Sequence, residues 1–272
     1  MKTTKLLLVC LLLTGLGIQA QKIYVRAGIG AAITTSAYYI GDWNSTGNSN
    51  TAEVKKKGLG TGLPFVLAAG YQVHENILIE LGVDYFYGFK VKYNDYTTYA
   101  KYEDNFKAQM LSIVPALVFT VPLDKFRPYA RLGLKIGVLN RIISEEHAEL
   151  TGELKTLAET RDYKTRDYGG IPIGVQAAMG TDIVLGDKLS LFAEIQVDGI
   201  SYAPKHGKYT KYDVNGTDQL ENMTTKEKEV DYVTDIDYGE DIPDDQPDKQ
   251  LRNNYPLTNV GLILGLKIKI GQ

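Results

Sequence analysis

The stretch that decides the fold is NVGLILGLKIKI, residues 259–270. Its residues alternate with a period of two, which is typical of a β-strand whose successive side chains point to opposite faces. One face is apolar throughout, whereas the other combines glycine and lysine. A strand of this length covers about 33 Å, and a tilt of about 40° reduces this to about 25 Å, the height of the apolar band that a transmembrane β-strand presents to lipid. The apolar face consists of Val260, Leu262, Leu264, Leu266, Ile268 and Ile270.

Seven further segments also alternate, although 59–73, 106–121 and 169–184 do so more weakly, so the sequence predicts eight strands. No part of the chain after the first twenty residues has eighteen consecutive apolar residues, which argues against membrane-spanning helices. The predicted strands are 23–34, 59–73, 77–92, 106–121, 128–141, 169–184, 188–200 and 259–270.

The connections between these segments alternate in length. Short turns at 73–76, 122–127 and 185–188 follow the even strands, and long polar loops at 35–57, 93–105, 142–167 and 203–253 follow the odd strands. All turns then lie at one end of an antiparallel up-and-down meander and all loops at the other. This asymmetry is typical of transmembrane barrels with short periplasmic turns and long extracellular loops.

The two faces distinguish a membrane barrel from a soluble one. A soluble barrel would place its apolar face inside and its polar face outside. Here the polar face is so rich in glycine that we expect it inside, where glycines leave room for long ionic side chains across a narrow lumen. The apolar face is then turned to lipid. The charged residues predicted to line the lumen are Arg26, Glu80, Asp84, Arg131, Lys135, Glu194, Asp198 and Lys267.

The composition excludes several classes of protein. The formal charge of −3 argues against a nucleic-acid-binding protein, which would be basic. One Cys and three His exclude a disulfide scaffold and a Cys/His zinc site. A mean hydropathy of −0.18 looks soluble, but it is also what results when an apolar lipid face is averaged with a polar lumen face and polar loops.

Residues 1–20 are predicted to be a cleaved signal peptide. Two lysines precede the apolar run LLLVCLLL, residues 6–13, and small residues precede Ala20. The run is too short for a membrane anchor, which needs about 20 apolar residues. The domain that remains, 21–272, is expected in the cell outer membrane.

The glycine-alternating strands, the stretch FRPYARLGL at 126–134 and the closing strand 259–270 resemble the outer-membrane β-barrel protein family, of the small OmpA/OmpX type. The resemblance covers essentially all of 21–272 and implies an eight-stranded porin-like barrel. The chain departs from the family in ending on Gln272 rather than on an aromatic residue. Pro64, Pro115 and Pro172 fall inside predicted strands, where we expect bulges or strand ends because proline lacks a ladder donor.

Two interpretations of the lumen remain open. The charges balance in number, which favours a salt-bridged plug, because an unpaired buried ion is costly and eight strands leave little room for water. The alternative is a small-solute, porin-like channel lined by the same charges. A cluster of aromatic residues at the outer end of one strand is predicted to form an interfacial girdle. Its members are Tyr85, Tyr87, Phe89, Tyr93, Tyr96 and Tyr99.

A lipid-modifying enzyme is the weakest alternative. His74 lies at a predicted turn, and His147 and His206 lie on predicted loops, with Ser144 three residues before His147. No nucleophile-elbow or metalloprotease motif is present. We therefore expect no enzyme activity, no cofactor and no metal.

The long loop at 203–253 carries an acidic stretch, Glu229–Asp248, that contains nine carboxylates and no Lys or Arg. Such runs are usually solvated and disordered, although clustered carboxylates are also ligands for Ca²⁺. The function predicted from the sequence is a monomeric structural barrel that contacts outer-membrane lipid and whose extracellular loops bind an extracellular or envelope protein or ligand.

Overall fold

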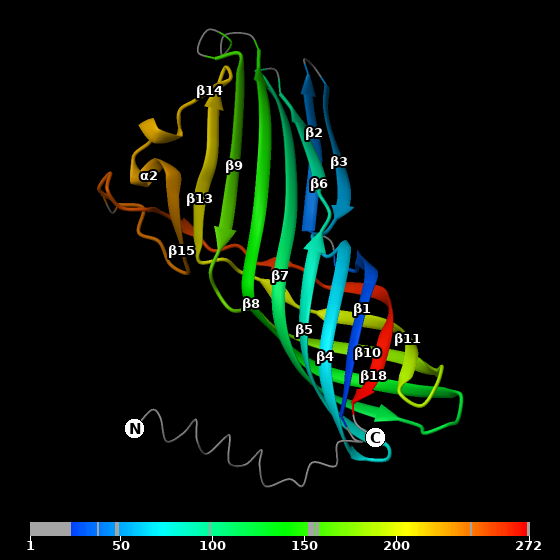
Figure 1. Ribbon diagram of the computed structural model, residues 1–272. Coiled ribbons are helices and arrows are strands. Elements are labelled where there is room, and N and C mark those ends of the chain that lie inside the picture. Colours follow the sequence, from blue (N-terminus) through cyan, green and yellow to red (C-terminus); the bar gives the residue numbers. More distant parts are fainter. Residues whose placement is uncertain are drawn as a thin grey trace, which may run out of the picture.

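The computed structural model describes residues 23–36, 38–46, 49–97, 99–151, 155, 158–239 and 241–270, with the backbone alone for 38–46 and 49–57. Its lower part is a closed antiparallel barrel of eight strands (Figure 1), because each strand pairs with the next along the chain and the two ends of the meander pair with each other. The predicted fold is confirmed. The order around the barrel is β1 (Ile23–Thr34), β4 (Gly62–His74), β5 (Ile77–Gly88), β7 (Ala100–Thr120), β8 (Phe126–Leu150), β10 (Ile173–Val184), β11 (Leu189–Gly199) and β18 (Asn259–Ile270).

The lipid-facing surface of the barrel follows the predicted alternation. Ile29 of β1 lies opposite Leu264 of β18, and the two side chains are 51% and 55% exposed. The intervening lumen-side residues are buried or half-buried, as the burial pattern of β5, which strictly alternates, also shows. The apolar side chains therefore form a continuous outer band, as expected for strands that face hydrocarbon. No helix of the described residues is long and apolar enough to cross a membrane.

The sheet continues far beyond the barrel on the extracellular side. β7 and β8 are each much longer than predicted, and their pairing reaches Ala100 opposite Leu150. Further strands add to both sides of this pair and build a tall wall above the barrel (Figure 1). The added strands are β6 (Val91–Tyr96), β2 (Tyr38–Thr46) and β3 (Ser49–Lys57) on one side, and β9 (Thr160–Tyr168), β13 (His206–Val214), β15 (Glu229–Val233) and β16 (Asp248–Leu251) on the other.

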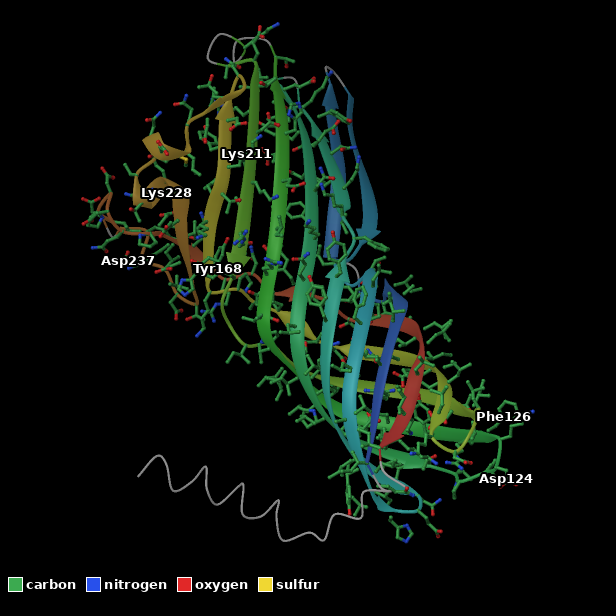
Figure 2. The ribbon with its side chains drawn as sticks, in the orientation of Figure 1. Asp124, Phe126, Tyr168, Lys211, Lys228 and Asp237 are labelled. Carbon is green, nitrogen blue, oxygen red and sulfur yellow. The ribbon has the colours of Figure 1, made fainter. Side chains whose placement is uncertain are left out.

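These added strands were expected to be irregular loops, and their sequences explain the difference. β9 reads TRDYKTRDY and β13 reads HGKYTKYDV, which are rich in the Tyr and Thr that favour strands. Both faces are polar because both meet water, so neither strand shows the apolar alternation that marks a membrane strand. We call the part of the sheet outside the barrel the extracellular sheet. Asp124, in the turn between β7 and β8, and Lys211, on β13, lie at opposite ends of the molecule (Figure 2).

The acidic stretch is also more ordered than predicted. It begins as β15, which pairs in parallel with β16 at the end of the stretch. A short helix, α2 (Thr225–Lys228), precedes it and is capped by Thr224 and Glu227. The remaining elements of this region are β14 (Thr217–Asp218), the 3₁₀ turn Leu220–Asn222, and the pair β12 (Ser201–Tyr202) and β17 (Tyr255–Pro256).

Two local expectations need correction. Tyr96 and Tyr99 cannot belong to an interfacial girdle with Tyr85, because they lie near the Ala100 end of β7, about 35 Å along the strands from the level of Tyr85. Pro172 lies just before β10, as expected. Pro64 and Pro115 instead lie inside β4 and β7. The predicted signal peptide lies outside the described residues.

Candidate functional site: the charged lumen and its extracellular cap

The structure places all eight of the charged residues expected in the lumen on the inner side of the barrel. Seven have side chains that are at most 6% exposed, and the side chain of Lys267 is 14% exposed. They come from five different strands, β1, β5, β8, β11 and β18, so only the closed ring brings them together. Strand alternation explains their common direction.

The centre of the lumen holds two arginines between two glutamates. Arg26 Nη1 donates to Glu194 Oε2 at 2.9 Å, and its Nε lies 3.3 Å from Glu80 Oε2. Arg131 Nη2 donates to the other oxygen of Glu194 at 2.7 Å. Tyr129 Oη also donates to Glu194, at 2.8 Å. Each carboxylate therefore neutralises guanidinium charge in a site with little access to water, where such pairing is needed.

A second group lies nearer the extracellular end. Lys135 Nζ lies 2.6 Å from Asp198 Oδ2 and 3.7 Å from Asp84 Oδ2. Gln176 connects the two groups, because its amide nitrogen donates to Asp84 and Asp198 while its amide oxygen accepts from Arg131. Ion pairs and hydrogen bonds thus join these two groups into one network.

Lys267 has a partner that the sequence reading missed. Its Nζ lies 2.7 Å from Asp182 Oδ2, at the periplasmic end of the lumen, and 4.2 Å from the centre of the Tyr24 ring. Asp182 and Gln176 lie on β10 in the same period-two phase as Gly174 and Gly180. That phase identifies both as lumen-facing, but the weaker alternation of residues 169–184 does not by itself predict which face is the inner one.

Glycines let bulky side chains enter the narrow lumen. Gly70 faces the ring of Tyr24 so closely that a Cβ at this position would overlap the ring. Tyr24 Oη can therefore reach across to donate to Glu80 Oε1 at 2.6 Å. Gly28 and Gly265 make the same kind of space for Phe192, whose ring stacks on the Arg26 guanidinium at 5.0 Å.

An apolar cluster, which we call the cap, lies at the extracellular mouth of the barrel. Tyr202 is its most buried aromatic residue, and its hydroxyl donates to the carbonyl oxygens of Gly169 and Asn140. At the opposite, periplasmic mouth a cavity of about 60 Å³ opens beside Asp182 and Lys267. The sequence did not predict the cap, because three of its ten buried residues, Ile142, Tyr202 and Leu257, lie outside the predicted strands. Its main members are Phe86, Met110, Ile142, Ile200, Tyr202 and Leu257.

The residues considered for catalysis do not form a site. Ser144 and His147 both lie on β8, not on a loop, and three-residue spacing in a strand turns them to opposite faces. His147 Nδ1 lies 2.7 Å from Asp162, and His206 Nδ1 lies 2.7 Å from Asp231, each in a cross-strand pair of the extracellular sheet. Among the described residues no three His, Cys, Asp or Glu side chains gather in a geometry that could hold a metal ion.

Several solved structures are similar to this chain at low sequence identity. Among solved structures, the chain is similar to Neisserial surface protein A, with 11% identity, a TM-score of 0.43 and coverage of 91% of this chain and 97% of that one. It is also similar to the outer membrane protein OprG from Pseudomonas aeruginosa, with 12% identity, a TM-score of 0.43 and coverage of 94% and 99%. It is similar as well to outer membrane protein W of E. coli, with 14% identity, a TM-score of 0.36 and coverage of 92% of this chain and 98% of that one. No curated protein sequence matches the chain.

The family model that describes the outer membrane protein beta-barrel domain matches residues 8–226, which is most of the chain. The match includes seven of the eight barrel strands. The closed barrel with its exposed apolar band and the family match lead to the same conclusion: this chain belongs to the outer membrane protein β-barrel family and is an outer-membrane barrel.

Proposed function

We propose that this protein is a structural and surface-interaction barrel, in which the lumen is closed and the extracellular sheet binds a partner. The observation that carries the first part is the row of ion pairs from Lys267 to Lys135, in which each lumen charge has an opposite charge within 4.0 Å. A permeating ion would have to break several of these contacts. In a lumen only wide enough for side chains, that cost favours a plug.

The cap supports the same proposal independently of the charges. Tyr202 and Ile142 are 0% and 1% exposed at the mouth through which a solute would pass. An apolar constriction of this kind excludes ions by keeping water out. The rival function, a small-solute channel, would require both barriers to open.

Single-channel recording tests the closed lumen. The refolded protein in a planar bilayer is expected to show no stable conductance. Two variants weaken the two barriers. Met110→Ala/Tyr202→Ala shortens two side chains of the cap, and Lys135→Ala breaks the charge group nearer the extracellular end. Leu132→Ala on the lipid face is the control. Stable openings of the wild-type protein would contradict the proposal and favour the channel.

The proposal for the surface rests on the size and composition of the extracellular sheet. It extends the β7–β8 pair by about 30 Å beyond the barrel and carries exposed charges and aromatic residues. Tyr238, in the segment between β15 and β16, is 84% exposed, and tyrosines are enriched among residues that dominate binding interfaces. The partner proposed is an extracellular or envelope protein or ligand.

Cell attachment tests the surface proposal, and gel migration controls for folding. Whole cells that display the protein should attach to a panel of matrix and envelope proteins, and Tyr238→Ser should reduce that attachment while the heat-modifiable gel migration of the barrel is unchanged. Equal attachment by cells without the protein would contradict it.

We also propose a monomer, because the pairing of β7 with β8 leaves the barrel without a free edge. Light scattering in detergent measures the mass.

A further inference from the structure

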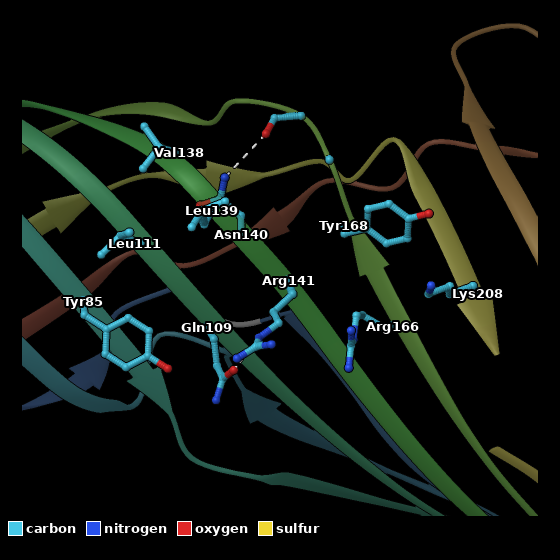
Figure 3. A pocket seen from close by; sticks show the side chains of 12 residues that line it. Tyr85, Gln109, Leu111, Val138, Leu139, Asn140, Arg141, Arg166, Tyr168 and Lys208 are labelled. Carbon is cyan, nitrogen blue, oxygen red and sulfur yellow. Dashed lines mark hydrogen bonds between the residues drawn. The ribbon is translucent and has the colours of Figure 1, made fainter. Parts of the chain in front are cut away.

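A groove of about 600 Å³ lies where the barrel passes into the extracellular sheet (Figure 3). The part nearer the barrel is apolar and is formed by Leu111, Val138 and Leu139. The part nearer the extracellular sheet is basic and is formed by Arg141, Arg166 and Lys208. Neither the lumen network nor the cap includes these basic residues.

A β-bulge explains why the apolar part faces outward. The register between β7 and β8 shifts between the pairs Leu111↔Leu139 and Ser112↔Gly137, which leaves Val138 as an extra residue. Bulges of this kind re-aim side chains. As a result Val138 and Leu139, although consecutive, are both turned out, with exposed fractions of 40% and 69%. They extend the lipid-facing band to the base of the groove.

The cations of the groove have no acidic partners. Arg166 and Lys208 form no ion pair with a described carboxylate, and the Arg141 guanidinium donates only to the amide oxygen of Gln109. Lys208 lies above the Tyr168 ring, 5.9 Å from its centre. By contrast, two nearby lysines of the extracellular sheet are paired: Lys164 contacts Glu145 at 2.9 Å, and Lys211 contacts Asp213 at 2.7 Å.

The strand register places these cations in two neighbouring rows. Arg166 lies opposite Lys208 on one side and Ile143 on the other, and Ile143 lies opposite Lys107. Lys107 also lacks an ion pair among the described residues and lies over the Tyr87 ring. Arg141 lies in the row below. Glu229 of β15 lies opposite Lys208 but forms no ion pair with it. Four positive charges therefore lie near a single carboxylate, and the net positive charge predicts an anionic ligand.

The height of the groove identifies the source of that anion. Arg141 is two residues beyond the exposed Leu139 on β8, or about 7 Å along the strand. The guanidinium is thus just outside the apolar band, at the depth of lipid headgroups. Cations at this depth attract anionic lipids, and arginine binds phosphate oxygens in a two-pronged geometry.

We propose that the groove binds the phosphate-bearing headgroup of a lipid in the outer leaflet. Arg141, Arg166 and Lys208 hold the phosphate, and Val138 and Leu139 contact the upper part of an acyl chain. The ligand class is an amphiphile with an ionised phosphate rather than a zwitterionic lipid.

Native mass spectrometry of the full protein in detergent tests this proposal. The probes are phosphatidic acid and phosphatidylcholine with the same acyl chains. We expect one phosphatidic acid bound at least 10-fold more tightly than phosphatidylcholine. The triple variant Arg141→Gln/Arg166→Gln/Lys208→Gln should weaken that binding by about 100-fold. If the triple variant does not refold, the single variant Arg166→Gln replaces it and should weaken the binding of phosphatidic acid about fivefold.

The matched control is Lys101→Gln/Lys155→Gln/Lys211→Gln. It removes the same charge from cations that already contact carboxylates, Glu149, Glu159 and Asp213. Its affinity for phosphatidic acid should remain within twofold of the wild-type value. Equal affinity for both lipids, or an equal loss in control and groove variants, would overturn the proposal. Displacement of the lipid by inorganic phosphate at equal concentration would also overturn it, because the groove would then be a site for free anions.

Discussion

Arg26 and Glu194 lie 168 residues apart in the sequence and meet inside the barrel, with Arg26 Nη1 2.9 Å from Glu194 Oε2. They come from β1 and β11, which are not neighbours in the sheet because β18 lies between them. The contact therefore crosses the lumen instead of following the wall. Glu194 accepts two further bonds, from Arg131 and Tyr129, so one carboxylate holds three strands together.

Removing the charge of Glu194 should strongly destabilise the barrel. In Glu194→Gln, the two arginines keep only Glu80 as a carboxylate neighbour, and breaking a buried ion pair costs about 3–5 kcal/mol. The free energy of unfolding is measured by urea titration of the refolded protein in micelles, followed by circular dichroism. Glu149→Gln is the control, because the Glu149 contact with Lys101 is exposed and 3.7 Å long. An exposed pair contributes less than about 1 kcal/mol. Equal losses in the two variants would show that the lumen network contributes no more than a surface pair.

A lysine on the lipid face should destabilise the barrel according to its depth. Leu264 lies near the middle of β18, on the apolar outer face. Leu264→Lys is therefore expected to cost about 2–4 kcal/mol of unfolding free energy in lipid. Ile270→Lys, on the same face at the end of the strand, should cost about 0–1 kcal/mol, since its charge reaches the interface. The same titration in lipid vesicles measures both. If Leu264→Lys costs no more than Ile270→Lys, the outer face does not span the hydrocarbon as assigned.

A single methyl group in the lumen should disturb the network through packing alone. Gly70→Ala places a Cβ against the Tyr24 ring and displaces the hydroxyl that donates to Glu80. Overpacking of this kind costs about 1–3 kcal/mol. Gly186→Ala, where a Cβ meets nothing within 4 Å, should be neutral within about 0.5 kcal/mol. Thermal unfolding of the two variants in detergent compares them. A neutral Gly70→Ala would mean that Tyr24 can give way without loss.

The sequence predicted the barrel better than the parts outside it, and the reason is physical. In the membrane each strand meets lipid on one face and the lumen on the other, so residues such as Leu264 and Gly265 alternate in character. Outside the membrane both faces of β9 and β13 meet water, and Tyr163 and Lys164 carry no sign of which way they point. The lumen charges could be found by their phase, but their partners could not. Lys267 meets Asp182 because β10, β11 and β18 are neighbours in the closed ring, which alternation alone does not specify.

Asp167 should make the stability of the extracellular sheet depend on pH. Its carboxylate on β9 is 8% exposed and accepts a hydrogen bond from Tyr232 of β15 at 3.0 Å. Burial raises the pKa of Asp167 to about 6, although the Tyr232 hydrogen bond opposes the shift. Because the folded pKa lies above the unfolded value, the folded sheet binds an extra proton between about pH 4 and 6. The stability from that proton is full below the unfolded pKa and is lost as the pH rises through about 6.

The wild-type sheet should therefore open more easily at pH 7.5 than at pH 4, by a difference of about 3 kcal/mol in opening free energy. Hydrogen exchange of the amides in β9, β13 and β15 measures that opening. Asp167→Asn keeps an oxygen that can accept from Tyr232 but cannot ionise, so the pH dependence of its opening free energy should be smaller than that of the wild type by about 3 kcal/mol, and its opening free energy should exceed the wild-type value at pH 7.5. Asp187→Asn, in the exposed turn between β10 and β11, should keep the wild-type pH profile. A wild-type sheet that is equally protected at both pH values would contradict the raised pKa, whereas the same pH dependence in Asp167→Asn would assign it to a different group.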